Sequence, residues 1–129
     1  MIKVKEIMTK NPVEVEAGKT VREAVQVMTE KTLGSLLVRK GHEIIGILEE
    51  SDVLKKVLAK DLNPYIATVE SVMSIPFIID GEKSDNDASD IMSRNKIRHL
   101  VVSDGSAIIG ILSMQDLLRP VYSGKTFWT

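Results

Sequence analysis

The 129 residues are 43% hydrophobic and 27% charged, with a formal net charge of −1, as expected for one soluble globular unit with a sizeable core. The near-neutral charge, without a strongly basic run, argues against a nucleic-acid-binding protein, and no apolar stretch approaches the roughly 18 residues of a membrane-spanning helix. The absence of cysteine excludes disulfides and thiolate chemistry, and Met1–Glu6 lack the apolar core of a signal peptide, so we expect a cytoplasmic protein.

The first half of the chain opens with a predicted amphipathic helical turn over Val4–Thr9 and a short strand over Val13–Val15, after Pro12. Thr20 and Glu23 then have the spacing of a capping box, in which a hydroxyl and a carboxylate satisfy backbone donors at a helix start. Behind this box, apolar residues recur at helical spacing and predict a helix with one buried face, formed by Val21, Ala24, Val25 and Met28.

Two apolar strands are predicted next, over Ser35–Arg39 and Glu43–Leu48, joined by a hairpin-type turn at residues 40–42. A second helix is expected over Ser51–Leu58. The linker that follows covers Asp61–Thr68, where an Asn-Pro pair breaks regular structure.

The second half follows the same order. Ser84 and Asp87 resemble a capping box with aspartate in place of glutamate, and the helix behind it is expected to bury Ala88, Ile91 and Met92. Two strands and a last helix are predicted over Arg98–Ser103, Ala107–Leu112 and Met114–Arg119. Because Pro120 has no backbone N–H, this last helix is predicted to stop before it.

The two halves are copies of one another. His42–Leu54 is echoed by Ser106–Leu118, so that Gly46 matches Gly110 and Asp52 matches Asp116, at an offset of 64 residues. Upstream of Pro12 and Pro76 the offset becomes 65, which aligns Met8-Thr9 with Met73-Ser74. A register kept over so many positions indicates a tandem repeat, whose copies must close one core together. The seam between them is a natural place for a ligand.

We therefore divide the chain into repeat 1 (residues 1–62), repeat 2 (residues 63–120, with the linker) and a tail (residues 121–129). The tail has no helical or strand period and carries Tyr122, Phe127 and Trp128. Its aromatic content predicts that it packs on a partner subunit or covers an exposed edge, although simple fraying is the usual fate of a terminus.

Each repeat combines a Met-Thr/Ser segment before a proline, a capped helix, an apolar strand, and a glycine followed by apolar residues and an aspartate. Over about residues 2–120 this pattern resembles a pair of cystathionine-β-synthase-type (CBS) domains, or Bateman module. The resemblance implies an α/β (α+β) fold of two βαββα repeats whose three-stranded sheets pack together about a pseudo-twofold axis. It also implies a homodimer formed through the helices, and two clefts between repeats that bind AMP, ADP, ATP or S-adenosylmethionine in many members.

One predicted cleft centres on Ser113 and Asp116. Free backbone amides at a helix start favour phosphate binding, and the resemblance assigns the aspartate to the ribose hydroxyls. The alternative is that the two residues only form a capping box at the helix start. Arg98 offers a fork of donors suited to phosphate, unless it is only a solvated strand end. His99 is a weaker candidate because strand alternation points it to the other face. By family geometry the cleft is completed by Ile111 and a base-binding wall of Asn11, Pro12 and Val13.

The first repeat departs from this pattern, with Glu49 at the place of Ser113 and Gly34-Ser35 at the place of Arg98-His99. A carboxylate there competes with a phosphate for the same amides. We therefore expect a second, weaker cleft, formed by Asp52, Ser51, Ile47, Pro76 and Phe77. The phenylalanine is suited to stacking on a purine, but such a residue is more often part of a core.

Catalytic signatures are not evident in this sequence. The two histidines, His42 and His99, fall in different copies, and we find no metal-ligand spacing, Walker-type phosphate loop or nucleophile elbow. We expect a regulatory module that is not an enzyme and has no metal or obligatory cofactor. Its expected partners are an adenosine-containing small molecule, a second copy and a regulated protein, but no membrane. Alternatives are a ligand-free structural or interaction module, a metal- or nucleic-acid-responsive CBS protein, and an enzyme with its site at the seam.

Overall fold

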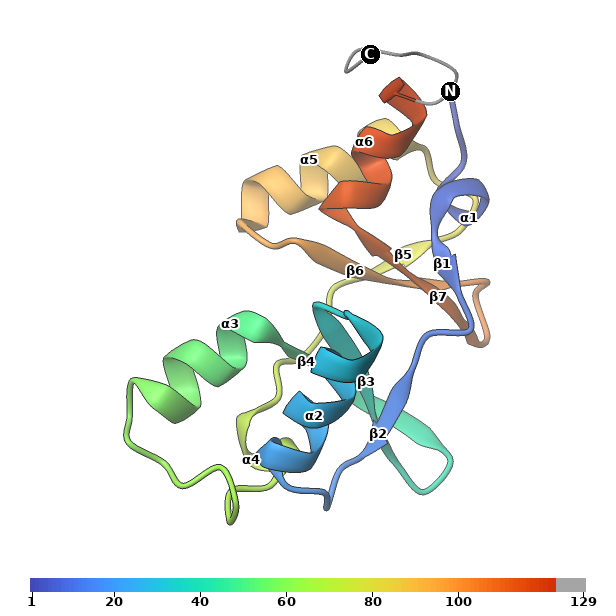
Figure 1. The fold of residues 1–129 in the computed structure, drawn as a ribbon. Coiled ribbons are helices and arrows are strands. Elements are labelled where there is room, and N and C mark those ends of the chain that lie inside the picture. The colour runs from blue at the N-terminus through green and yellow to red at the C-terminus, as the bar shows by residue number, and fades with distance from the viewer. Residues whose placement is uncertain (123–129) are drawn as a thin grey trace. The chain divides into compact units, whose positions relative to one another are not determined.

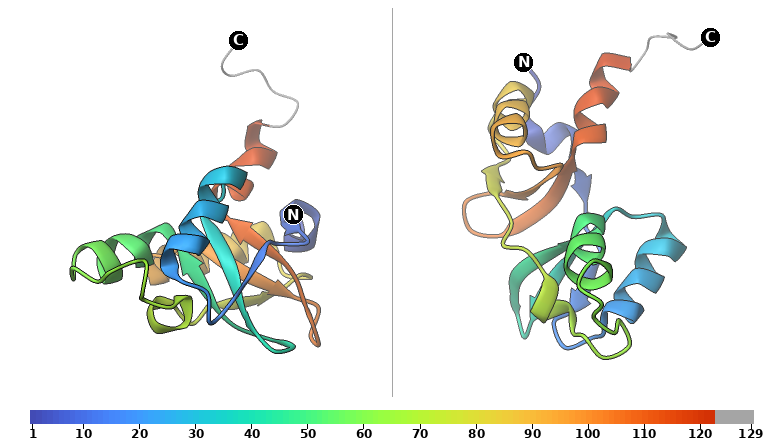
Figure 2. Two further views of the ribbon diagram at one scale, coloured as in Figure 1. Left: turned by 60° about the horizontal axis from the view of Figure 1, so that its bottom comes forward. Right: turned by 90° about the vertical axis from the view of Figure 1, so that its left-hand side faces the viewer.

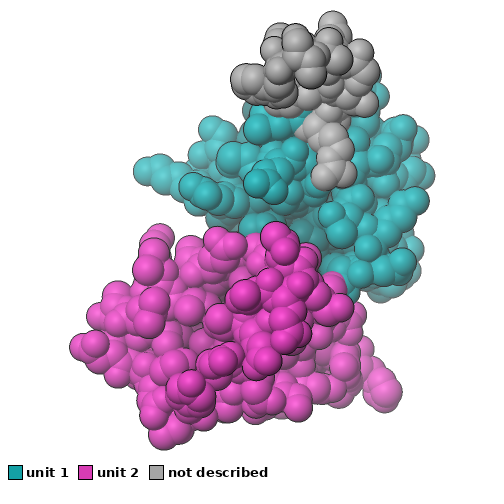
Figure 3. All heavy atoms as spheres, in the orientation of Figure 1, with its two compact units in different colours: residues 1–12, 76–129 teal, residues 13–75 magenta. Residues whose placement is uncertain are grey.

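The computed structural model of the chain describes residues 1–122 and divides into two compact units (Figures 1 and 3). Unit 1 contains Met1–Pro12 and the chain from Pro76 onward, and unit 2 contains Val13–Ile75. Each unit has one β-sheet and its own hydrophobic core. The mixed α/β class predicted from the sequence is confirmed.

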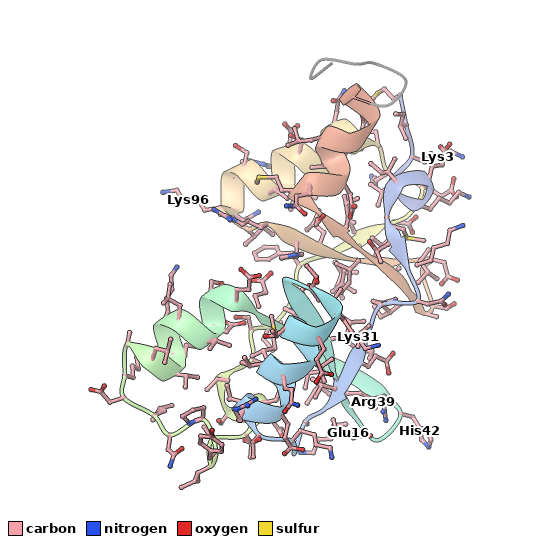
Figure 4. All side chains as sticks on the ribbon, in the orientation of Figure 1. Lys3, Glu16, Lys31, Arg39, His42 and Lys96 are labelled. Atoms are coloured by element: carbon pink, nitrogen blue, oxygen red, sulfur yellow. The ribbon has the colours of Figure 1, made fainter. Side chains whose placement is uncertain are left out.

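Unit 2 is built on a three-stranded sheet in the order β2-β3-β4. Its strands are β2 (Glu14–Glu16), β3 (Ser35–Lys40) and β4 (Glu43–Glu49). β2 runs parallel to β3, whereas β3 and β4 form an antiparallel hairpin that turns at Gly41, where φ is 64°. Arg39, labelled in Figure 4, links the strands at the surface through ion pairs to Glu14 and Glu16 at 2.8 and 2.7 Å.

The helices of unit 2 supply the rest of its core. They are α2 (Val21–Lys31), α3 (Glu50–Asp52), the π-helix η1 (Val53–Leu58) and α4 (Val69–Val72). The predicted capping box is confirmed, because the Thr20 hydroxyl accepts from the Glu23 N–H at 3.1 Å and the Glu23 carboxylate accepts from the Thr20 N–H at 3.2 Å. The buried core side chains include Val21, Ala24, Met28, Leu36, Val38, Leu48 and Val57.

Unit 1 has a four-stranded sheet in the order β1-β7-β6-β5. Its strands are β1 (Thr9–Lys10), β5 (Ile78–Asp80), β6 (His99–Ser103) and β7 (Ile108–Ser113). Its helices α1 (Val4–Ile7), α5 (Asp85–Asn95) and α6 (Met114–Tyr122) lie on one face of that sheet (Figures 1 and 2). The buried core of unit 1 is formed by Val4, Ile79, Ala88, Met92, Leu100, Val102 and Leu112.

The two repeats exchange their first segments. Met8-Thr9 belongs to repeat 1 but lies in unit 1, where Thr9 pairs with Ile111. Met73-Ser74 begins the second copy but lies in unit 2, where Ser74 and Ile47 exchange two backbone hydrogen bonds of 2.8 and 2.9 Å. The compact units therefore follow a different division of the chain from the sequence repeats, because each body takes its Met-Thr/Ser segment from the other repeat.

Charged side chains also hold the first segment of the chain on unit 1. Glu82 pairs with Lys3 at 2.8 Å and with Lys5. The hydrogen bond from Lys3, followed by that from Lys5, lowers the pKa of the Glu82 carboxyl to about 2. These groups are exposed, so they guide the segment at the surface while Val4 anchors it in the core.

The repeated glycines explain how the exchanged segments approach the sheets. A methyl group built at Gly110 would meet the Met8 thioether and lie 2.7 Å from the Thr9 carbonyl oxygen. One built at Gly46 would meet the Met73 thioether and lie 3.1 Å from the Ser74 carbonyl oxygen. Both glycines admit a neighbouring backbone that a larger side chain would push away. The sequence analysis identified the pair but not this close approach.

We expect Gly110→Ala to destabilise the protein more than Gly46→Ala. Both methyl groups would first meet a flexible methionine side chain, but the backbone carbonyl oxygen behind it is closer at Gly110, at 2.7 Å, than at Gly46, at 3.1 Å. Overpacking of this kind costs about 1–3 kcal/mol, and Gly110→Ala should fall in that range. Urea unfolding of both variants measures the difference, and an equal or larger loss for Gly46→Ala would contradict this explanation.

Three predicted features are corrected by the structure. The predicted helical turn ends at Ile7, and Thr9 instead joins β1, which gives unit 1 a fourth strand where the resemblance implied three. The predicted helix over Ser51–Leu58 is a short α3 followed by a π-helix. α6 does not stop before Pro120 but continues to Tyr122. The ring of a proline fixes φ near about −65°, which is a helical value, so the helix can continue with the loss of one backbone hydrogen bond.

Among the described residues, no helix has both the length and the apolar character needed to cross a membrane. The packing predicted for the aromatic tail concerns residues beyond Tyr122 and lies outside the described residues.

Candidate functional site

The site predicted around Asp116 is assembled at the junction of β7 and α6 in unit 1. The Asp116 carboxylate accepts a hydrogen bond from the Ser113 N–H at 2.8 Å, and the Ser113 hydroxyl accepts from the Asp116 N–H at 3.1 Å. Only 4% of Asp116 is exposed. The capping box that was the alternative for these residues is therefore present, and it fixes a buried carboxylate at the start of the helix.

β6 brings the predicted basic residues beside this junction. His99 lies opposite Ser113 in the antiparallel pair β6–β7, and the Arg98 carbonyl accepts from the Met114 N–H at 2.9 Å. Arg98 is exposed and His99 is half-buried. The structure thus brings a guanidinium-bearing residue, a hydroxyl and a buried carboxylate to the adjoining ends of β6, β7 and α6 in one unit.

The other residues predicted for this cleft are distributed differently. Ile111 is buried in β7, opposite Thr9. Asn11 and Pro12 follow β1 in unit 1, and Asn11 is exposed with φ of 51°. Val13 belongs to unit 2. Thr9, which the prediction left out, is the residue that the strand register places across from the site.

The equivalent carboxylate in unit 2, that of Asp52, is also buried, at 4% exposure, but it is occupied by the chain itself. One oxygen accepts from the Glu49 N–H at 2.9 Å. The other accepts from the Ser74 hydroxyl at 2.6 Å and pairs with the Lys56 ammonium at 2.9 Å. Three groups of unit 2 therefore already surround the carboxylate predicted to hold a ribose.

Lys56 and Ser74 are the residues that the sequence analysis missed. The spacing of four residues between Asp52 and Lys56 on a predicted helix was the available signal for this ion pair. The part played by Ser74 could not be inferred in the same way, because it comes from the exchanged segment, 22 residues further along the chain.

Two further residues of the predicted second cleft, and Glu49 beside them, are placed as follows. Ile47 is buried in β4, and Ser51 is exposed in α3. Glu49 is the N-cap residue of α3 and is half-buried, and its backbone N–H donates to the Asp52 carboxylate at 2.9 Å. The two remaining predicted residues, Pro76 and Phe77, belong to unit 1, and Phe77 is 45% exposed, so it is not a core residue.

An open cavity of about 270 Å³ lies elsewhere on unit 1, between β5 and α5. Its lining is mixed in charge and shares no residue with the predicted sites: Ile78, Ile79, Asp80, Lys83, Asp87, Asp90, Ile91 and Arg94. Within residues 1–122, no group of three or more His, Cys, Asp or Glu side chains is arranged to hold a metal ion.

Comparison with known proteins identifies the repeated pattern. The family model described as the CBS domain matches this chain twice, over residues 4–59 and 69–123. An uncharacterized protein of Methanocaldococcus jannaschii is 28% identical over 117 residues, which cover 88% of this chain and 63% of that protein. An uncharacterized protein of Methanopyrus kandleri is 33% identical, with 89% of this chain and 58% of that protein covered. The chain thus spans about three-fifths of the length of these relatives.

Solved structures show the same fold. A putative signal-transduction protein with CBS domains from Burkholderia ambifaria superimposes with a TM-score of 0.90 at 28% identity, covering 98% of both chains. A hexameric CBS-CP12 protein from bloom-forming cyanobacteria gives a TM-score of 0.83 at 31% identity, covering 92% of this chain and 70% of that one.

Proposed function

This chain belongs to the CBS-domain family, as a tandem pair of CBS domains. We propose that it is a regulatory module that binds an adenine nucleotide at Asp116. In this proposal the chain catalyses no reaction of its own. The observation that carries the proposal is the group of residues on β6, β7 and α6 of unit 1. There a buried carboxylate in the first turn of α6 lies beside Ser113 at the end of β7 and the exposed Arg98 before the start of β6.

These residues offer complementary chemistry for the two ends of a nucleotide. A carboxylate accepts hydrogen bonds from vicinal ribose hydroxyls. The planar guanidinium of Arg98 donates to phosphate oxygens in a fixed fork. Regulation further requires that the ligand binds one conformation or assembly more tightly than another, because a ligand with equal affinity for both shifts nothing.

Calorimetry on protein shown by mass spectrometry to be free of small molecules tests the proposal. AMP, ADP, ATP and S-adenosylmethionine are titrated separately, and at least one should bind. If none of the four binds below millimolar concentration, the chain is not an adenine-nucleotide sensor, and the alternative of a ligand-free interaction module gains support.

We further propose that the module self-associates through the exposed apolar side of η1. Leu54 and Leu58 are 60% and 61% exposed, and large apolar side chains gathered on one surface commonly mark an interface. The hexameric state of the cyanobacterial relative shows that a protein of this family assembles. This surface belongs to unit 2 alone and does not depend on the nucleotide site.

Leu54→Lys should weaken self-association. Burying one leucine contributes roughly 1.5–3 kcal/mol, so the dissociation constant of the assembly should rise roughly tenfold to a hundredfold. Sedimentation over a range of concentrations measures it, with the neighbouring exposed Lys55→Gln as the control. An unchanged assembly in Leu54→Lys, in protein that unfolds at the wild-type temperature, would rule out this surface.

A further inference from the structure

Lys56 makes an unusually complete set of contacts for a surface lysine. Besides its ion pair with Asp52 at 2.9 Å, its ammonium donates to the Ser74 hydroxyl at 3.0 Å and to the Val72 and Met73 carbonyl oxygens at 3.1 and 3.3 Å. An ammonium has three donors, and four oxygens of the same unit surround this one. The lysine thus occupies a small oxygen cage that closes over the carboxylate.

The carboxylate under this cage has little accepting capacity left. Two carboxylate oxygens offer about four lone-pair positions, and Glu49, Ser74 and Lys56 already fill three. A pair of ribose hydroxyls needs two free positions. A ribose therefore cannot be held by Asp52 unless Lys56 leaves it.

The sequence of the second repeat differs at the position that matches this lysine. At the offset of 64 residues, Lys56 corresponds to Pro120, which carries no cation, whereas the hydroxyl of Ser74 is retained as Thr9. The backbone also differs, because Lys56 lies in the π-helix η1 while the matching segment α6 is α-helical. π-Helical turns are rare and often occur at functional positions. The two repeats therefore differ at the one position that closes the cage.

We infer that Lys56 is an internal occupant of the first ligand site, which closes Asp52 to nucleosides and leaves one nucleotide site per chain, at Asp116. The inference rests on the proposed function and adds the number of sites and the residue that sets it. Glu49 lies at the start of α3, next to this site, and its negative charge should repel a phosphate. A first site opened by removing Lys56 should therefore bind a nucleoside better than a phosphate-bearing ligand.

The test compares Lys56→Met, which keeps an apolar stem but removes the ammonium, with Lys55→Met at the adjacent exposed position. Both are made in wild type and together with Asp116→Ala, and adenosine is titrated by calorimetry. We expect no adenosine binding by Asp116→Ala alone or with Lys55→Met. Asp116→Ala/Lys56→Met should bind adenosine with a dissociation constant at least tenfold below the highest concentration at which Asp116→Ala shows no binding. Adding Asp52→Ala should abolish this new site.

Three outcomes would overturn the inference: two ligands per wild-type chain, no new site in a folded Lys56→Met variant, or weaker nucleotide binding in that variant, which would make Lys56 a phosphate ligand instead. If wild type binds none of the nucleotides but the double variant binds adenosine, the Asp116 proposal fails while the role of Lys56 stands.

A second measurement uses the wild-type protein alone and needs no ligand. Trace acetylation of the wild-type protein, followed by mass spectrometry, compares the amine reactivities of Lys56 and Lys55. The Lys56 ammonium should react at least tenfold more slowly, because its hydrogen bonds must break before the amine can attack. Equal rates would show that the cage does not hold Lys56 in solution.

Discussion

Val4→Asp is expected to unfold unit 1, although Val4 belongs to the first repeat. The Val4 side chain is fully buried in the core that Leu100 and Leu112 build, and it enters that core through the exchanged segment. A carboxylate placed there without a partner should cost about 4 kcal/mol or more. That is a large part of the roughly 5–15 kcal/mol by which domains are stable.

Hydrogen exchange read by mass spectrometry locates this damage. Val4→Asp should raise exchange first in β6 and β7, whereas β3 and β4 should keep more protection. Val69→Asp is the matched variant, because Val69 is the counterpart of Val4 at an offset of 65 and is fully buried in the core of unit 2. It should give the reverse pattern. If Val4→Asp instead exposes β3 and β4 first, the first segment packs with its own repeat and the exchange is wrong.

Asp116→Ala is expected to remove most of the affinity for the nucleotide. Loss of a charged hydrogen-bond acceptor costs about 1.5–3 kcal/mol of binding free energy, which raises the dissociation constant roughly tenfold to a hundredfold. Calorimetry with the best of the four ligands measures the change. The same substitution also removes the acceptor of the Ser113 N–H, a hydrogen bond worth about 1 kcal/mol of stability, while the Ser113 hydroxyl can still cap the helix.

Asp116→Asn separates these two effects. An asparagine side chain still accepts from the Ser113 N–H, so stability should be retained, but it lacks the negative charge and should still lose affinity. Asp52→Ala should lower stability, because it leaves the Lys56 ammonium and the Ser74 hydroxyl without their shared partner. If Asp52→Ala weakens binding more than Asp116→Ala does, the site lies in the first repeat.

The sequence by itself determined the features that depend on local order. The helices at Thr20 and Ser84 were predicted from their capping boxes, and the hairpin around Gly41 from apolar runs separated by turn residues. The duplicated glycine and aspartate identified the family. These signals suffice because a helix cap or a hairpin is made by residues close together in the chain.

Only the tertiary structure decided which compact unit each Met-Thr/Ser segment joins. It also decided which groups form hydrogen bonds with each aspartate carboxylate. Gly46 and Gly110 are glycines because a backbone distant in sequence passes within contact distance. Asp52 is closed by Ser74 of the exchanged segment together with Lys56, a combination that no local pattern contains. Two matching stretches of sequence thus build different sites, because contacts that distinguish them join residues far apart along the chain.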